Sequence, residues 1–191
     1  RIGLTRNKIV LQPIGPLGDG SPALATLVDF ARRYFGLPAV AQPAITMSSL
    51  RPRSRVRGRR QYRTGDLLDA LRLQIPKEAY CLIGVTQDDL YPGPSWNFVF
   101  GEARFHDRVG VYSFCRYDPA FAGEPRDADT PTTILRRGFK LMAHEIGHMF
   151  AITHCIHGHC VMNGSNNLEE TDRSAGREPS PEQAFSDAHL D

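Results

Sequence analysis

The sequence predicts a mixed α/β fold, in which helices pack behind a twisted and mostly parallel sheet. Apolar runs of strand length alternate along the chain with segments of helical periodicity, which is the first observation behind this prediction. The second is the continuous apolar run over residues 79–85 (AYCLIGV), which is typical of a strand buried on both faces. The third is size, because 191 residues with 41% hydrophobic side chains can form the core of a single domain.

Two strands and two helices are expected in the part of the chain that precedes this buried run. The strands cover residues 8–14 and 40–47, the second of them weakened by a proline. The first helix is expected over residues 21–36, with Ser21 as its N-cap and a glycine at its end. The second helix is expected over residues 64–75, with a threonine as its cap and a proline directly after it.

Two further strands are expected over residues 97–103 (NFVFGEA) and 109–116 (VGVYSFCR), joined by a polar turn. Residues 88–94 are rich in turn-forming types and are expected to form a loop. A strand left at the edge of a sheet can hold an extended peptide by main-chain hydrogen bonds. The candidate residues for this substrate strand are Asn97, Phe98, Val99 and Phe100.

Seven arginines lie between residues 51 and 63, and two interpretations compete for them. The first is a patch that binds nucleic acid or an acidic partner. The second is a solvated, mobile loop before the next helix. The run contains proline, serine and glycine but only one aromatic residue, Tyr62, and stacking on bases normally needs more aromatic side chains. We therefore expect a solvated loop and no nucleic-acid partner.

A long helix, expected to begin at residue 130, carries the most informative motif of the chain. His144 and His148 are four residues apart, so that on a helix both imidazoles lie on one face, one turn apart. Two nitrogens that converge in this way form half of a tetrahedral zinc site. If the helix breaks after residue 150, His154 can return as a third ligand and leave the fourth position open for water, as in catalytic zinc sites.

Glu145 lies between the two helical histidines and is too close to them in sequence to be the third ligand. It can instead reach a water held on the metal and take a proton from it. Two histidines at this spacing also occur by chance on helix surfaces. The third histidine, the methionine downstream and the apolar character of the helix favour a metal site over that interpretation.

The overall composition excludes several classes of protein. A formal net charge of +2 does not indicate a chain built to bind nucleic acid or a membrane surface, and no apolar run has the length of a transmembrane helix. Four cysteines are too few for a disulfide scaffold, which favours an intracellular, reducing compartment such as the cytoplasm. Because the chain begins with Arg1 rather than Met, the sequence leaves open whether a signal peptide has been removed. A monomer is expected.

Residues 144–154 followed by Met162 resemble the metzincin metallopeptidases, which share the pattern HExxHxxGxxH and a methionine turn beneath the zinc. The continuation HCIHGHCVM, with Cys155 and Cys160, is similar to that of the archaemetzincins. Other stretches are also similar to the longer members of that family, among them TGDLLDAL, CLIGVTQDDLYPG and GSNNLEE. The resemblance covers residues 60–175.

The resemblance implies a metzincin-like α/β (α+β) fold with an active-site helix and a small irregular C-terminal subdomain. Residues 1–150 would form the sheet-and-helix subdomain, and residues 151–191 would carry the third ligand and the methionine turn within one catalytic domain. By the same resemblance Glu145 is the general base and later the proton donor, and Met162 lies beneath the ligands. The zinc ligands implied are His144, His148 and His154.

The chain departs from the family at the turn after the active-site helix. The family has a glycine there, whereas this chain has Ala151. Alanine at a positive φ costs about 1 kcal/mol, so we expect either a different turn geometry or a strained site.

The second departure concerns a structural zinc that the family binds with Cys155, Cys160 and a later CPxC pair. Ser180 and Gln183 replace that pair here. Two thiolates cannot complete a tetrahedral site, and the histidines between them, His157 and His159, are too tightly spaced to close one. We therefore expect one zinc per chain. If a second metal were bound, Cys155 and Cys160 would be its candidate ligands.

These observations favour a zinc-dependent metallopeptidase that hydrolyses peptide bonds in peptides or proteins with a zinc-bound water activated by Glu145. One alternative is a non-catalytic zinc-binding relative, which Ala151 and the lost cysteine pair favour and Glu145 opposes. A second is a zinc-dependent endoribonuclease with the same histidine spacing. Those enzymes lack a glutamate after the first histidine, so Glu145 argues against that class.

Overall fold

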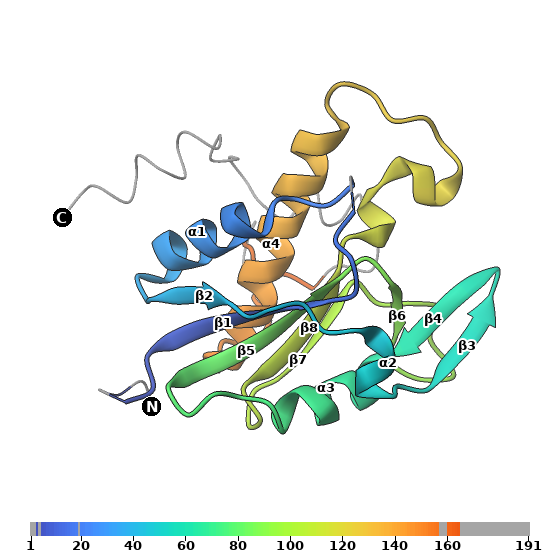
Figure 1. The fold of residues 1–191 in the computed structure, drawn as a ribbon. Coiled ribbons are helices and arrows are strands. Elements are labelled where there is room, and N and C mark those ends of the chain that lie inside the picture. The colour runs from blue at the N-terminus through green and yellow to red at the C-terminus, as the bar shows by residue number, and fades with distance from the viewer. Residues whose placement is uncertain (1–2, 4, 19, 157–159, 165–191) are drawn as a thin grey trace.

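A five-stranded sheet forms the centre of the protein in a computed structural model that describes residues 3, 5–18, 20–156 and 160–164 (Figure 1). The strand order is β2-β1-β5-β8-β7. All neighbouring pairs are parallel except β7 with β8, and β7 lies at one edge. The predicted mixed and mostly parallel sheet is confirmed. The strands are β1 (Lys8–Ile14), β2 (Ala39–Ala41), β5 (Ala79–Thr86), β7 (Gly101–Arg104) and β8 (Val109–Ser113).

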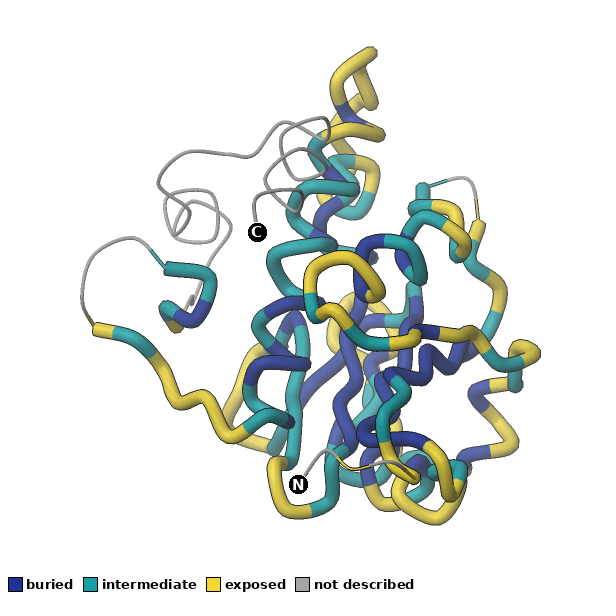
Figure 2. The backbone as a smooth tube through the Cα atoms, turned by 90° about the vertical axis from the view of Figure 1, so that its left-hand side faces the viewer, coloured by how far each residue is buried: buried dark blue, intermediate teal, exposed yellow. Residues whose placement is uncertain are grey.

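Helices cover both faces of this sheet and create two apolar cores. The helices α1 (Leu24–Phe35) and α4 (Thr130–Met149) lie on one face, and α2 (Met47–Leu50) and α3 (Thr64–Arg72) on the other. Alternate residues of a strand point to opposite faces, and β5, buried at every position, contributes to both cores. Figure 2 shows the strands buried between more exposed outer segments. None of the helices among the described residues has the length and apolar character that a membrane span requires.

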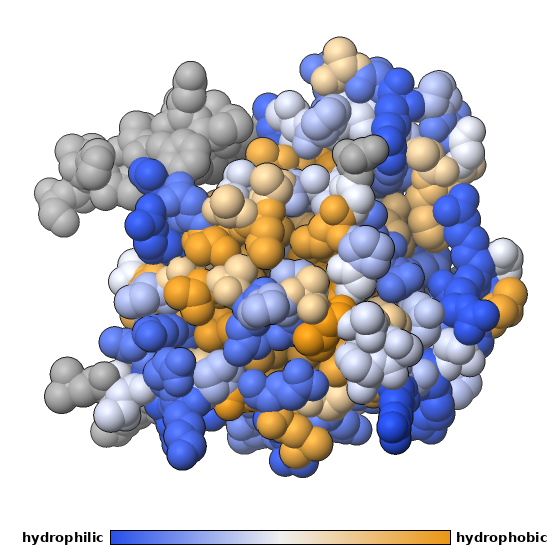
Figure 3. Space-filling view, viewed as in Figure 1, coloured by the Kyte–Doolittle hydropathy of each residue, from blue (hydrophilic) through white to orange (hydrophobic). Residues whose placement is uncertain are grey.

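A second sheet overturns the prediction that residues 51–63 form a solvated loop. Its order is β3-β4-β6, built from β3 (Ser54–Arg57), β4 (Arg59–Arg63) and β6 (Asp89–Tyr91). Gly58, at a φ of 73°, makes the turn of the β3–β4 hairpin, which projects from the right of Figure 1 and lies in a hydrophilic region of Figure 3. The prediction of a loop over residues 88–94 was also wrong, because residues 89–91 form β6, which pairs with β4 in this second sheet.

The buried carboxylate of Asp89 explains why an acidic residue can lie in that short strand. Arg116 binds it with both Nε and Nη2, each at 2.7 Å from one carboxylate oxygen. A bidentate pair of this kind compensates for the burial of the charge, because a carboxylate without a partner would be costly there. The partner lies far along the chain, so the local sequence gave no sign of it.

Several predicted boundaries need correction. The strand expected over 97–103 begins only at Gly101, so that Asn97, Phe98, Val99 and Phe100 precede β7, with a single bridge from Val99 to Leu90. The strand expected over 40–47 ends at residue 41, before the proline that weakened it. The remaining changes concern Ser21, which is not a cap because Ala23 precedes α1; Thr64, which is the first residue of α3; and residues 115–117 and 119–122, which form short 3₁₀ helices.

The packing of α4 depends on a glycine at its closest approach to a buried ring. A Cβ added at Gly138 would lie 2.3 Å from Cε1 of Phe114, a fully buried side chain at the end of β8. We predict that Gly138→Ala lowers the free energy of unfolding by about 1–3 kcal/mol, because overpacking exceeds the gain in helix propensity. Urea unfolding followed by circular dichroism measures this change.

The control for this prediction is Gly65→Ala in α3, where the added Cβ meets no atom closer than 3.4 Å. That variant should change stability by no more than about 1 kcal/mol, with a sign that favours the folded state. Equal behaviour of the two variants would show that Phe114 does not set the position of α4.

Candidate metal centre

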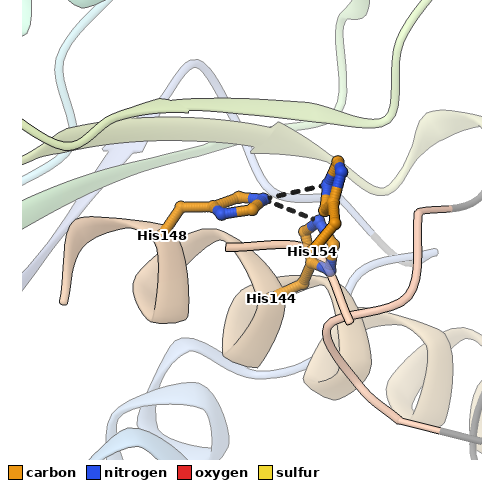
Figure 4. Close-up of side chains that lie close together, drawn as sticks. All are labelled: His144, His148 and His154. Atoms are coloured by element: carbon orange, nitrogen blue, oxygen red, sulfur yellow. Dashed lines mark hydrogen bonds between the residues drawn. The ribbon is translucent and has the colours of Figure 1, made fainter. Parts of the chain in front are cut away.

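Two consecutive segments bring three histidines together. His144 and His148 lie one turn apart on α4, which ends at Met149. The chain then reverses, because Ala151 has a φ of 67° and the amide of Ile152 donates to the carbonyl oxygen of Gly147 at 3.0 Å. The reversal returns His154 to the face of the helix, and Figure 4 shows the three imidazoles pointing toward one another. The positive φ expected from the alanine at this turn is therefore present.

The separation of the three imidazoles fits a tetrahedral metal ion. Nε2 of His148 lies 3.0 Å from Nε2 of His144 and 3.2 Å from Nε2 of His154, and the three ligand atoms lie within 4.8 Å of one another. Nitrogens about 2.0–2.1 Å from a tetrahedral zinc are about 3.3 Å apart. Among the residues that the structure describes, this is the one group of three or more histidine, cysteine or carboxylate side chains so arranged.

Hydrogen bonds on the far side of two of the rings fix their tautomers. Nδ1 of His144 donates to the carbonyl oxygen of Val161 at 2.8 Å, and Nδ1 of His148 to that of Ile152 at 2.9 Å, because a carbonyl can only accept. The two Nε2 atoms then carry lone pairs that face each other without a proton between them, which is the arrangement that a cation satisfies. Burial lowers the pKa of His144 to about 4, so its imidazole is neutral at physiological pH, as a ligand must be.

Glu145 lines the same pocket and is almost fully buried. Burial, with a smaller contribution from the carboxylate of Glu102, raises the pKa of Glu145 to about 8. Its side chain lies against the backbone of Gly101 in β7, where an added Cβ would come within 2.6 Å of Oε1. A carboxyl group whose pKa lies near neutrality can both accept and donate a proton, as a general acid–base group requires.

Met162 lies under the helix at the level of the histidines. Its side chain is buried. Its sulfur would be 2.6 Å from a Cβ added at Gly147, the residue directly before His148. The thioether thus fills the space that this glycine leaves on the helix. The amide of Cys155 donates to the carbonyl oxygen of Met162 at 3.0 Å, which ties the segment with His154 to the one beneath it.

The structure does not bring Cys155 and Cys160 into the histidine group. The amide of Met162 donates to Sγ of Cys160 at 3.5 Å, and the side chain of Asn163 donates to the carbonyl oxygen of Cys155. The other residues considered for a second metal site, His157, His159, Ser180 and Gln183, lie outside the described residues. The second site therefore stays a prediction.

The remaining wall of the pocket comes from residues that sequence reasoning did not place there. They include Trp96, Glu102, Tyr117, Lys140 and Asn163. The one local sign was Gly101, since a glycine inside a strand often marks the close approach of another group. Of the predicted substrate strand, Val99 and Phe100 line the pocket although they precede β7.

Comparison with known proteins gives consistent results. The model of peptidase family M54 matches residues 73–178. Human archaemetzincin-2 is 34% identical over 198 aligned residues, which cover 88% of this chain and 55% of that protein. The chain thus spans about half the length of the curated relatives it matches first.

Two crystal structures have the same fold. Archaemetzincin from Methanopyrus kandleri superposes with a TM-score of 0.70 at 34% identity, covering 89% of this chain and 87% of that one. A zinc-dependent peptidase from Methanocorpusculum labreanum superposes with a TM-score of 0.69 at 25% identity, covering 86% and 92%. The metzincin-like fold predicted from the sequence is confirmed.

The left-handed conformation of Ala151 can be tested by restoring glycine. We predict that Ala151→Gly raises the free energy of unfolding by about 0.5–1 kcal/mol, because relief of the left-handed strain exceeds the entropy that glycine adds to the unfolded chain. The matched control, Ala70→Gly within α3, should lower it by about 1 kcal/mol. Urea unfolding of the metal-free proteins measures both, and a loss of stability in Ala151→Gly would contradict the prediction.

Proposed function

Because the chain belongs to peptidase family M54, whose model matches more than half of it, we propose that it is a zinc-dependent metallopeptidase acting on peptides or proteins. The observation that carries the proposal is the convergence of three imidazole nitrogens beside a buried glutamate in one pocket. A site built only for stability has no need of a carboxyl group there. The predicted relationship to the archaemetzincins is confirmed by the family match and by the relatives at 33–41% identity.

His144, His148 and His154 would hold one zinc ion, a metal that the solved relative from Methanocorpusculum labreanum is named for. When bound there, zinc supplies a Lewis acid for the carbonyl of the scissile bond and lowers the pKa of water to about 7. Met162 would support the ligands from below. The replacement of the second cysteine pair by Ser180 and Gln183 supports one zinc rather than two.

Glu145 performs the proton transfers in this proposal. Its carboxylate accepts a proton from the attacking water and then donates it to the nitrogen of the departing amine, so that the residue returns to its starting state. Burial supports the role, since it keeps the pKa of Glu145 close to neutrality and excludes bulk water from the carboxyl group. Gly101 leaves the space that the carboxyl group occupies.

The edge of the sheet supports an extended binding mode for the substrate. β7 pairs with β8 on one side only within the described sheet, and its first residue, Gly101, contacts Glu145. A peptide added as a further antiparallel strand along β7 would pass the pocket with its backbone extended. Of the four residues predicted for the substrate strand, Val99 and Phe100 would then form part of the pocket wall beside that edge, whereas Asn97 and Phe98 precede β7 without lining the pocket.

We also propose a monomer in a reducing, intracellular compartment. The cysteine pattern of the sequence supports the reducing compartment.

The proposal predicts that Glu145→Gln abolishes cleavage while zinc stays bound. The amide keeps the shape of the side chain but cannot accept a proton, so turnover should fall by about 10²–10⁴-fold. A mixed peptide library read by mass spectrometry gives both rates and cleavage sites. Glu124→Gln, an exposed glutamate in the loop before α4, is the matched control and should keep the wild-type rate. Failure of the zinc-loaded wild type to cleave any peptide would favour the non-catalytic relative.

Zinc content tests the ligand set independently of turnover. We predict one zinc per chain for the wild type and for the double variant Cys155→Ser/Cys160→Ser, and none for His148→Ala. Zinc at a hundred times its Kd should add about 2.7 kcal/mol to the free energy of unfolding, because it binds the folded chain alone. Elemental analysis and thermal unfolding with and without zinc measure these changes. Loss of zinc from the cysteine variant would contradict the assignment.

A further inference from the structure

The arginine-rich hairpin β3–β4 has no part in the function proposed so far. Several of its arginines have partners elsewhere in the chain. Nη2 of Arg53, the residue directly before β3, lies 2.7 Å from a carboxylate oxygen of Asp66, and the guanidinium of Arg59 lies 4.5 Å from the centre of the Phe121 ring. Arg55 differs from these, because its partners are backbone carbonyls of the segment that forms one wall of the pocket.

Arg55 uses all three guanidinium nitrogens. Nη2 donates to the carbonyl oxygens of Trp96 (2.6 Å) and Asn97 (3.0 Å), and Nη1 to that of Pro94 (3.4 Å). Nε donates to the side-chain oxygen of Gln61, its direct partner across the hairpin, at 2.7 Å. The guanidinium plane is also fixed from one side, since it lies 4.0 Å from the centre of the Tyr91 ring.

The segment held in this way has no strand or helix of its own. Residues 94–97 are exposed and connect β6 with the start of β7. The carbonyl of Asn97 also accepts from Nε2 of the buried Gln61 at 3.0 Å, and its side chain accepts from Nη1 of Arg57 at 2.7 Å. Hydrogen bonds from the hairpin thus replace the ladder that would order this backbone in a sheet. A lysine could not serve equally, because it lacks the planar fork.

Trp96 is the side chain that this segment presents to the pocket. It is the only tryptophan of the sequence, is 57% exposed, and lines the pocket together with the three histidines. Val99 and Phe100 continue the same apolar wall. A large exposed indole beside polar groups is suited to contact with an apolar side chain of a bound molecule, since such contact removes it from water.

We propose that Arg55 is a positioning residue that holds Trp96 as the wall of a subsite for an apolar side chain of the peptide substrate. The inference rests on the proposed peptidase function for its substrate class. The part that concerns Arg55 and Trp96 does not need turnover and can be tested without it.

Fluorescence anisotropy of Trp96 tests the positioning directly, because the emission comes from a single residue of the full chain. In Arg55→Gln the amplitude of fast local motion should rise about twofold or more, with and without zinc. Arg53→Gln removes the same charge two residues away, directly before β3, but from a side chain that pairs with Asp66, and it should leave the signal at its wild-type value. Arg55→Lys should lie between them. Circular dichroism checks that each variant is folded. If Arg55→Gln does not fold, the comparison is made with Arg55→Lys instead.

Kinetics on paired peptides test the subsite. For peptides with leucine or phenylalanine next to the cleaved bond, Arg55→Gln should raise KM about tenfold with kcat within about twofold of wild type, while serine peptides change little. Trp96→Ala should lose the same selectivity. Introducing Arg55→Gln into the Trp96→Ala variant should then change selectivity no further, because both substitutions disrupt the same wall of the subsite. Zinc content should not change in any of them.

Other results would overturn the proposal. One is an Arg55→Gln variant that matches Arg53→Gln in anisotropy and selectivity. Another is a selectivity change by Arg55→Gln that persists in the Trp96→Ala background. If the wild type cleaves no peptide, the peptidase function fails separately, and selectivity is then read from peptide binding to Glu145→Gln by Trp96 fluorescence.

Discussion

The amide of Ile152 donates to the carbonyl oxygen of Gly147, and this hydrogen bond reverses the chain at the end of α4. Without the reversal, His144 and His148 would offer only two nitrogens on a half-buried helix face. With it, the carbonyl of Ile152 becomes the acceptor for Nδ1 of His148, so that the same turn brings in the third imidazole and orients the second. The strained φ of Ala151 is the local cost of this arrangement.

The two sides of the pocket are held by different means. His144 and His148 lie on α4, which packs on the sheet through the larger apolar core. The opposite wall has little regular structure and depends on polar side chains that reach over from the small sheet, Arg55 and Gln61 in particular. Because each of these side chains donates to the backbone carbonyl of Asn97, the wall is fixed in position while its own side chains stay available to a ligand.

Elements with a local periodic signal could be predicted from the sequence. The first strand was predicted with its observed bounds, Lys8–Ile14, because its apolar run is continuous. The start of α4 at Thr130 was predicted from a proline, and the histidine spacing then predicted that His144 and His148 lie on one face of the helix. The motif also predicted Glu145 beside the histidines, and the structure places it in the same pocket because it lies between them on the helix.

The features that were missed depend on partners distant in sequence. The hairpin over residues 54–63 looked like a solvated loop, since neither the acceptors of Arg55 nor the pairing of β4 with β6 can be read from the run itself. Asp89 looked like a turn residue because Arg116 follows only after 27 positions. The contact between Gly101 and Glu145 likewise joins two segments that only the folded sheet brings together.

X-ray absorption at the zinc edge, on protein loaded with one equivalent of the metal, tests most directly that the histidines alone form the metal centre. The spectrum measures the type and distance of the ligand atoms without reference to any activity. The account predicts three nitrogen ligands at about 2.0–2.1 Å, one further light atom, and no sulfur. A sulfur shell at about 2.3 Å would contradict it, because the metal would then be bound by Cys155 or Cys160.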